Sequence, residues 1–312
     1  MSPALPRRVV VLAGGTGGAK LARGLLDEVG EGLTVIANTG DDHEWLGVHV
    51  SPDPDLCTYW LTDEIDTERG WGIAGDSFTV FERLVALGAP EWFGLSDRDL
   101  ATCLRRRELM DAGDRQTEAQ RQIAAALRAG CEVLPMCDAP VRTMVRTEAG
   151  WRGFQEFMIV DRAEPEILEV RLDGIEATEP SPEVRAAIEG ADAIVIGPSN
   201  PIISIGPILA VPGMRELLSE ASAPVVAVSP FVAGRAVKGP TEPFMRSQGL
   251  EVSAAGVAES YTGLLDGLVV DAADPGPAPA MPGVVALPTL MDGPRSRREV
   301  AAAVLAHTAT LR

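Results

Sequence analysis

The sequence lacks the cysteine patterns of zinc sites and of disulfide-stabilised domains. Its four cysteines (Cys57, Cys103, Cys131 and Cys137) form no C-x-x-C pair. Cys131 and Cys137 are close together but have no histidine partners nearby, so zinc is not expected. Reduced thiols are the default in the cytosol, and we therefore expect a cytoplasmic protein.

Long apolar runs and an excess of basic charge are also missing. No stretch of 18 apolar residues occurs, and residues 1–8 lack the apolar core of a signal peptide, so we expect neither a membrane span nor a leader. The formal net charge is −18, from 27 Lys and Arg against 45 Asp and Glu. Nonspecific binding to nucleic acid or to an anionic membrane needs a basic surface, and both are therefore excluded. An anionic ligand would therefore have to be bound by local hydrogen-bond donors or by a metal ion.

What the chain has is length, glycine and apolar residues. Its 312 residues, 46% of them hydrophobic, with 32 glycines and 24 prolines, are typical of a loop-rich globular enzyme with an ample core. No internal repeat occurs. We expect one α/β domain over residues 1–312, with a helical insertion at about 57–130 and a C-terminal tail helix at about 295–312.

The glycine-rich stretch near the start is the most informative one. Val9–Leu12 predicts a buried parallel strand, Gly14 to Gly18 a tight turn, and residues 19–28 a helix. This order brings backbone N–H groups and a positive helix end to one point, which is suited to phosphate. The spacing fits neither G-x-G-x-x-G, whose last glycine is replaced by Lys20, nor the Walker pattern, because Leu21 follows Lys20. We expect a phosphate-bearing ligand of nonstandard type; the alternative is a turn that only packs the helix on the strand.

Acidic residues follow the second predicted strand, Leu33–Ala37. Asn38-Thr39-Gly40-Asp41-Asp42 comes directly after it, and Ser51-Pro52-Asp53-Pro54-Asp55 soon afterwards. Ligands of open α/β sheets bind at the carboxyl ends of strands. We expect the four aspartates to lie in loops, and we expect a site for Mg²⁺ in this stretch, because that ion takes one or two carboxylates together with substrate phosphates. A ribose-binding acid and an ordinary turn are the alternatives for Asp41 and Asp42.

The rest of the chain contains a helical region followed by further strands. Helices are expected at residues 78–87, 97–110, 114–127, 181–189 and 295–307. Short strands of a small antiparallel or mixed sheet are expected at 133–136, 141–145 and 157–160. Buried strands are expected at 193–196, 224–228 and 268–270. The fold class is therefore α/β, a Rossmann-like and mostly parallel sheet with a helical insertion and a small additional β segment.

Polar loops follow two of the later strands. They contain Ser199-Asn200 and Ser229-Pro230-Phe231, and we expect both to line the crevice of the glycine turn. An amide can donate and accept, which makes Asn200 the better hydrogen-bonding candidate. A turn residue held between two prolines is the alternative.

The sequence resembles the 2-phospho-L-lactate transferase family of coenzyme F420 biosynthesis over residues 8–275. The resemblance rests on motifs that are weak singly but specific as an ordered series: Gly14-Gly15-Thr16-Gly17-Gly18, Asn38-Thr39-Gly40-Asp41-Asp42, Ser51-Pro52-Asp53-Pro54-Asp55, Gly70-Trp71-Gly72, Asp97-Arg98-Asp99 and Gly197-Pro198-Ser199-Asn200-Pro201. It implies a Mg²⁺-dependent transferase with a GDP-linked phosphorylated three-carbon acid (phospholactyl, phosphoenolpyruvyl or phosphoglyceryl) as donor. The acceptor would be the terminal ribityl hydroxyl of the deazaflavin Fo, and GMP would be released.

With this resemblance, the residues predict three sets of roles. The expected catalytic residues are Asp55, which would orient the attacking hydroxyl, Asp42 and Arg98. The expected metal ligands are Asp41, Asp42 and Asp55. The expected nucleotide- and substrate-binding residues are Gly14, Gly15, Thr16, Gly17, Gly18, Lys20, Asn38, Thr39, Trp71, Ser199, Asn200 and Ser229.

Two of these expectations have a plain structural alternative, and two other functions compete with the transferase. A tryptophan such as Trp71 is more commonly a core residue, and Arg98 is equally a partner in a local salt bridge. Asp53, between two prolines, is expected to be structural. The competing functions are a non-catalytic glycine-rich regulator that binds a nucleotide sugar or dinucleotide, and a Rossmann oxidoreductase, which the failed G-x-G-x-x-G spacing disfavours. We also expect a homodimer.

Overall fold

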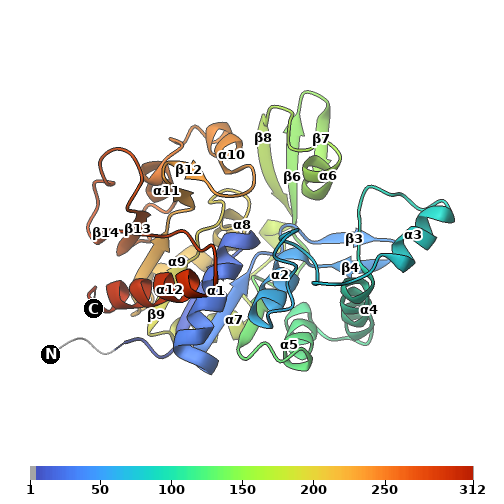
Figure 1. Cartoon of the computed structure of the whole chain (residues 1–312), viewed down its shortest axis with the longest axis horizontal. Helices are drawn as coiled ribbons and strands as arrows, with labels where there is room; N and C mark the ends of the chain where they lie inside the picture. The colour runs from blue at the N-terminus through green and yellow to red at the C-terminus, as the bar shows by residue number, and fades with distance from the viewer. Residues whose placement is uncertain (1–4, 312) are drawn as a thin grey trace.

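A seven-stranded sheet lies at the centre of the computed structural model, which describes residues 5–311 (Figure 1). Its strands are short apolar runs: β1 Val9–Ala13, β2 Leu33–Ala37, β5 Glu132–Pro135, β9 Ala193–Ile196, β10 Val225–Val228, β13 Gly267–Asp271 and β14 Val284–Leu287. Their spatial order is β14-β13-β10-β9-β1-β2-β5, and every neighbouring pair is parallel. The predicted Rossmann-like sheet is confirmed.

The order of the strands reverses at β1. From β1 the chain proceeds outward to β2 and β5, and then returns to β9 on the other side of β1 and proceeds outward to β14. Val9 is therefore paired with Leu33 on one side and with Ala193 on the other. Ligands of open α/β sheets bind at such a reversal, outside the carboxyl ends of the strands.

Helices cover both faces of the sheet, because alternate residues of each strand point to opposite faces. Val9 and Val11 of β1 belong to one hydrophobic cluster, and Val10 and Leu12 to the other. The first cluster includes side chains of α1 Gly15–Val29, α2 Pro52–Leu61 and α12 Pro294–Ala309. The second includes side chains of α7 Pro182–Glu189, α8 Gly206–Ala210, α9 Met214–Ser219, α10 Thr241–Ser247 and α11 Ala254–Ser260. The result is a three-layered α/β/α arrangement.

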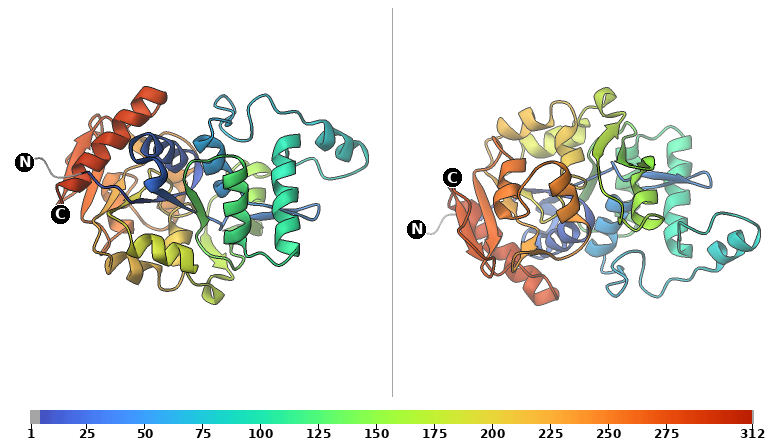
Figure 2. Two further views of the ribbon diagram at one scale, coloured as in Figure 1. Left: turned by 90° about the horizontal axis from the view of Figure 1, so that it is seen from below. Right: turned by 90° about the horizontal axis from the view of Figure 1, so that it is seen from above.

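Two additions project from this arrangement. The first contains the hairpin β3 His43–Trp45 and β4 Val48–Val50, with α3 Thr79–Ala86, α4 Asp97–Asp111 and α5 Gln116–Ala126. Figure 2 shows α3 at the end of the molecule opposite α12. The second is an antiparallel sheet of β6 Arg142–Thr147, β7 Gly150–Gly153 and β8 Glu169–Asp173, with α6 Phe154–Ile159 (Figure 1). A short hairpin, β11 Phe231–Val232 and β12 Arg235–Ala236, follows β10. No helix of the described chain is long and apolar enough to cross a bilayer.

Four local predictions are wrong. The glycine turn, residues 14–18, is the N-cap and first turn of α1 rather than a separate turn before a helix that starts at residue 19. Residues 157–160 end a helix rather than form a strand, since Phe154 and Phe157 are buried at helical spacing in α6. Residues 133–136 overlap β5, which joins the central sheet beside β2 instead of a small separate one. Asp53 and Asp55 lie in the first turn of α2 rather than in a loop, because Pro52 at the first helical position fixes φ for a helix and acidic residues favour its positive end.

Candidate functional site

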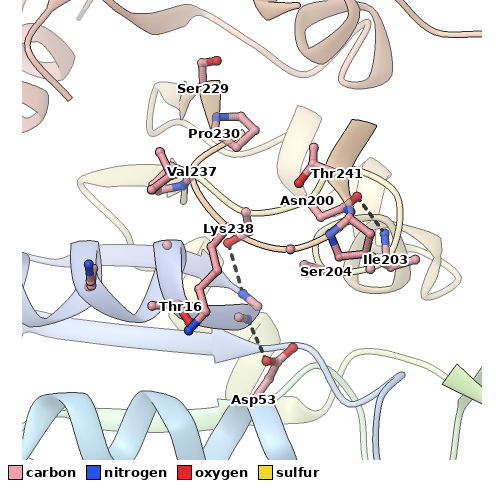
Figure 3. Close-up of a pocket in the computed structure, with 18 of the residues that line it drawn as sticks. Thr16, Asp53, Asn200, Ile203, Ser204, Ser229, Pro230, Val237, Lys238 and Thr241 are labelled. Carbon is pink, nitrogen blue, oxygen red and sulfur yellow. Dashed lines mark hydrogen bonds between the residues drawn. The ribbon is translucent and has the colours of Figure 1, made fainter. Parts of the chain in front are cut away.

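A cavity of about 340 Å³ opens at the carboxyl ends of β1 and β9, where the strand order reverses. Its walls come from the glycine turn, the ends of α2 and α6, and the loops after β9, β10 and β14 (Figure 3). The residues that line it include Gly15, Thr16, Lys20, Asp41, Asp53, Asn200, Lys238 and Thr289.

The glycine turn places the start of α1 against the cavity. Gly15 has φ +65°, a left-handed conformation that favours glycine, and its N–H donates to Asp53 Oδ1 at 2.6 Å. Gly14, Gly15, Thr16 and Gly17 line the cavity. The first N–H groups of any helix have no partner within the helix, and the positive end of the helix dipole lies here. This wall is suited to an anion.

Gly17 and Gly18 have to be glycines because the chain packs closely against them, and not because a ligand approaches. A Cβ on Gly17 would lie 2.0 Å from the carbonyl oxygen of Pro198, and one on Gly18 would lie 2.7 Å from Ser199 Oγ. Both contacts are shorter than real Cβ contacts. The turn and the loop after β9 therefore hold each other, and a valine at Gly17 would disturb the protein before it met a ligand.

Asp53 and Asn38 fix the turn to α2. Asn38 Nδ2 donates to Asp53 Oδ2 at 2.9 Å, while Asp53 Oδ1 accepts from Gly15. Burial raises the pKa of Asp53 to about 6, although these two hydrogen bonds lower it. The charge of Asp42 contributes a further increase. The structural role expected for Asp53 agrees with these contacts, but its carboxylate also lines the cavity.

Asp41 faces the cavity beside Asp53. Burial, followed by the charge of Asp53, raises the pKa of Asp41 well above its usual range. Its Oδ1 is buried and has no hydrogen-bond partner in the described part of the chain. Two adjacent carboxylates, one with an oxygen left unpaired, are a donor set that fits Mg²⁺, a cation that prefers oxygen ligands.

Both lysines of the chain line this cavity. Lys20 Nζ donates to the carbonyl of Met291 at 2.9 Å and lies 5.6 Å from the centre of the Trp60 ring. Lys238 Nζ donates to the carbonyl of Gly70 at 3.3 Å, and Figure 3 shows its side chain directed toward the start of α1. Burial lowers the pKa of both amines, and the charges of Arg297 and Lys238 lower that of Lys20 further. In a chain of net charge −18, two ammonium groups in one cavity make it a local anion site.

Asn200 combines its two predicted roles. Its Oδ1 accepts the N–H of Ile202 at 2.9 Å, as a turn residue would, whereas its Nδ2 is buried without a partner among the described residues. That amide remains a donor for a ligand in the cavity. Ser229 is also in the wall, where its Oγ accepts the N–H of Phe231 at 3.2 Å.

The predicted residues divide into those that line the cavity and those that do not. The lining group is Gly14, Gly15, Thr16, Gly17, Lys20, Asp41, Ser199, Asn200 and Ser229. The other group is Gly18, Asn38, Thr39, Asp42, Asp55, Trp71 and Arg98. The structure therefore does not bring Asp41, Asp42 and Asp55 together at one cavity wall.

Asp42 and Asp55 lie in buried hydrogen-bond networks. Asp42 Oδ2 lies 2.8 Å from His49 Nε2, and Asp42 Oδ1 accepts from Ser51 Oγ at 2.8 Å. Both oxygens of Asp55 accept from the guanidinium of Arg106, which is fully buried. With these partners, neither carboxylate is free for a metal ion in the way that Asp41 is.

Trp71 and Arg98 lie on the outside of the first addition. Trp71 is 46% exposed, and the Arg69 guanidinium lies 5.2 Å from the centre of its ring. Arg98 is exposed; it donates to the carbonyl of Ala74 and its Nε lies 3.5 Å from Asp76. These contacts match the salt-bridge alternative for Arg98.

Sequence reasoning missed Lys238, Thr289 and Met291. Lys238 follows Val237 in a Gly- and Pro-containing loop and is one of two lysines in a chain with 25 arginines, from 27 basic residues in all. The scarcity of lysine was a signal that could have identified it. Thr289 and Met291 follow β14, a strand that was not predicted.

Comparison with known proteins identifies relatives along nearly the whole chain. The model of the family described as 2-phospho-L-lactate transferase CofD matches residues 9–281. A phosphoenolpyruvate transferase of Streptomyces griseus is 44% identical over 276 residues, covering 86% of this chain and 87% of that protein. A 2-phospho-L-lactate transferase of Methanosarcina acetivorans is 42% identical over 267 residues, covering 85% and 86%. A phosphoenolpyruvate transferase of Thermobifida fusca is 41% identical and covers 96% of this chain and 97% of that protein.

A solved structure shares the fold. A UPF0052-family protein of Bacillus halodurans superposes with a TM-score of 0.62 over 97% of this chain and all of that chain. Its sequence is 18% identical, so this likeness concerns the fold alone.

Proposed function

Since the chain belongs to the 2-phospho-L-lactate transferase CofD family, we propose that it transfers a phosphorylated three-carbon acid from a GDP-linked donor to the ribityl hydroxyl of the deazaflavin Fo. The observation that supports this best is a single cavity, at the reversal of the sheet, that contains a helix start, two carboxylates and both lysines. Transfer of a phosphoryl-type group depends on positioning and on neutralising charge, and these are the groups that do both.

The diphosphate of the donor binds between the start of α1 and the two lysines. The free N–H groups of the helix start donate to phosphate oxygens, and Asn200 Nδ2 supplies a further donor. Lys20 and Lys238 exchange their hydrogen bonds to backbone carbonyls for the anion. Attraction between the two ammonium groups and the diphosphate then replaces two hydrogen bonds to neutral carbonyls.

Asp41 and Asp53 lie where the reacting groups of the donor and of Fo would bind. The ribityl oxygen bonds to the phosphorus that carries the acid, and the bond from that phosphorus to the GMP oxygen breaks. The hydroxyl proton passes to a carboxylate, for which the unpaired Oδ1 of Asp41 is placed. Asp41 and Asp53 would hold Mg²⁺, which supplies the positive charge that the phosphates and the leaving GMP require. Asp53, held by Gly15 and Asn38, keeps its position throughout.

The apolar part of the cavity accommodates the ring of the deazaflavin. It is lined by Phe154, Met158, Ile203, Val237, Leu290 and Met291. Such a surface favours packing against the face of a planar ring, while the polar end binds the phosphates.

The test is product formation with each activated acid. Purified protein is mixed with Fo, Mg²⁺ and the GDP-linked phospholactate, phosphoenolpyruvate or phosphoglycerate, and GMP release and product mass are measured. We expect GMP and a new Fo phosphodiester with at least one donor. Binding of donor and Fo without GMP release from any of the three would favour the non-catalytic regulator instead.

The homodimer and the cytoplasmic location remain predictions. Light scattering on the purified protein tests the first, because a dimer doubles the 32.9 kDa mass of one chain. Fractionation of cells that produce the protein tests the second.

A further inference from the structure

Asp271, the last residue of β13, lies behind the cavity wall and holds four hydrogen bonds. Its Oδ2 accepts the N–H of Thr289 at 2.8 Å and the Thr289 hydroxyl at 3.0 Å. Its Oδ1 accepts the N–H of Ala273 at 3.0 Å and that of Ala233 at 3.2 Å. The side chain is buried and does not itself line the cavity.

These bonds reach two separate parts of the wall. Thr289 begins the segment Thr289–Met291, and all three of its residues line the cavity. Ala233 lies between β11 and β12, and β12 is followed directly by Val237–Thr241. All five residues of that second segment also line the cavity. One carboxylate therefore joins two wall segments that are more than 40 residues apart in the chain, 241 and 289 being their nearest ends.

Each wall segment is connected to one of the two lysines. Met291 provides the carbonyl that accepts Lys20 Nζ, and Lys238 is part of the other segment. The Thr289–Met291 segment lies beyond residue 281, where the match to the family model ends. This part of the wall was therefore not identified by the family match.

We propose that Asp271 is a positioning residue, which sets both wall segments and thereby the places of the Lys20 and Lys238 ammonium groups for the anionic donor. Burial raises the pKa of Asp271, but the hydrogen bonds from Thr289, Ala273 and Ala233 outweigh it and leave the pKa below its usual value. The carboxylate is ionised at neutral pH, and charge strengthens all four bonds. An amide in its place would direct an N–H₂ group at one of the donors.

The two lysines give a readout that needs no substrate. Acetic anhydride modifies unprotonated, accessible amines, and mass spectrometry quantifies acetylation at Lys20 and Lys238 separately. In folded Asp271→Asn we expect both lysines to react roughly tenfold faster than in the wild type, because each loses its fixed place. In Thr289→Val, which removes only the hydroxyl bond, we expect a faster reaction at Lys20 alone. Thr289→Ser retains that bond and should react as the wild type does.

The matched control is Asp266→Asn, at the residue that directly precedes the other end of β13. Asp266 Oδ2 accepts the N–H of Val225 at 2.8 Å, and Asp266 does not line the cavity. This variant should leave the acetylation of both lysines unchanged. Wild-type rates at both lysines in Asp271→Asn, or equal increases in Asp266→Asn, would overturn the proposal; if Asp271→Asn does not fold, wild-type rates in Thr289→Val would do so.

The kinetic consequence rests on the proposed function. In Asp271→Asn we expect KM for the GDP-linked donor to rise roughly tenfold while KM for Fo stays near the wild-type value. If the wild type transfers nothing but the acetylation pattern is as expected, the proposed function fails and the positioning role stands. If transfer is normal and acetylation does not respond, the reverse holds.

Discussion

Two pairs of aspartates lie within fifteen residues of each other in the sequence, yet their surroundings are opposite. Asp42 and Asp55 are held by partners within the protein itself, Asp42 by a hydrogen bond with His49 and Asp55 by an ion pair with Arg106. Asp41 and Asp53 face the cavity and face each other's charge, which contributes to the raised pKa of Asp41. The first pair stabilises the fold, and the second is left for a ligand.

The comparison shows how one acidic stretch separates into two roles. Consecutive residues in a helix are about 100° apart, so Asp53 and Asp55 in the first turn of α2 point to nearly opposite sides. Asp53 meets the glycine turn, and Asp55 meets the basic side chain of α4. An unpaired oxygen on Asp41 therefore marks the cavity pair, whereas both oxygens of Asp42 and of Asp55 accept hydrogen bonds from the protein.

The largest expected effect is on stability, at Asp55. Asp55→Leu leaves the fully buried Arg106 without its anion and should lower the free energy of unfolding by about 3–5 kcal/mol. Adding Arg106→Met removes the buried charge as well, and should recover most of that loss. Urea denaturation measures both. Equal losses in the single and double variants would mean that the ion pair is not what Asp55 contributes.

Asp41→Asn should lower activity without lowering stability, unlike Asp55→Leu. The substitution removes the repulsion with Asp53, so the melting temperature should stay the same or rise, while turnover falls roughly 100-fold because a reacting carboxylate is lost. Exposed Asp111→Asn is the control, since that residue forms a surface ion pair with Arg107 and does not line the cavity. Near wild-type turnover in Asp41→Asn would remove Asp41 from the mechanism.

The stability of the protein should depend on pH through Asp53. Folded Asp53 has a pKa of about 6, above its unfolded value of about 4, so the folded state holds a proton that the unfolded state has lost. Stability without a divalent cation should therefore fall as the pH rises from about 4 through 6. Mg²⁺ competes with that proton and should raise the melting temperature more at pH 7 than at pH 5. Melting curves in Mg²⁺ and in EDTA test this, and an equal gain at both values would argue against a metal at Asp53.

The smallest effect is expected at Arg98. Its contacts with Asp76 and Ala74 are on the surface, where an ion pair contributes less than about 1 kcal/mol. Arg98→Lys should keep turnover within about twofold of the wild type, measured as GMP release, because the residue does not line the cavity. A large fall in kcat with unchanged stability would restore the catalytic role that its position in the sequence suggested.

The sequence predicted most of the sheet and the walls built from its strand ends. β1, β9 and β10 are apolar runs followed by Gly, Ser or Asn, and parallel strands necessarily bring those ends to one edge. It could not predict which aspartates face the cavity, because that depends on where α2 begins. The apolar run 157–160 was equally ambiguous in isolation, since a buried helix and a strand share it. Lys238 reaches the site only through the folding of a long loop, which no local pattern records.

The pairing of β1 with β9 has a consequence for how the protein is made. β1 leaves the ribosome long before its second neighbour, which is 184 residues later, the distance from Val9 to Ala193. During most of synthesis one edge of β1 is therefore unpaired, and domains fold only when their last essential strand is available. Pro198 and Ser199, against which the glycine turn closes, come out with that late strand. A nascent chain halted before β9 contains the glycine turn and all four aspartates, but it lacks the segments that close the cavity around them. Donor binding should therefore begin only after β9 and the loop that follows it have been translated.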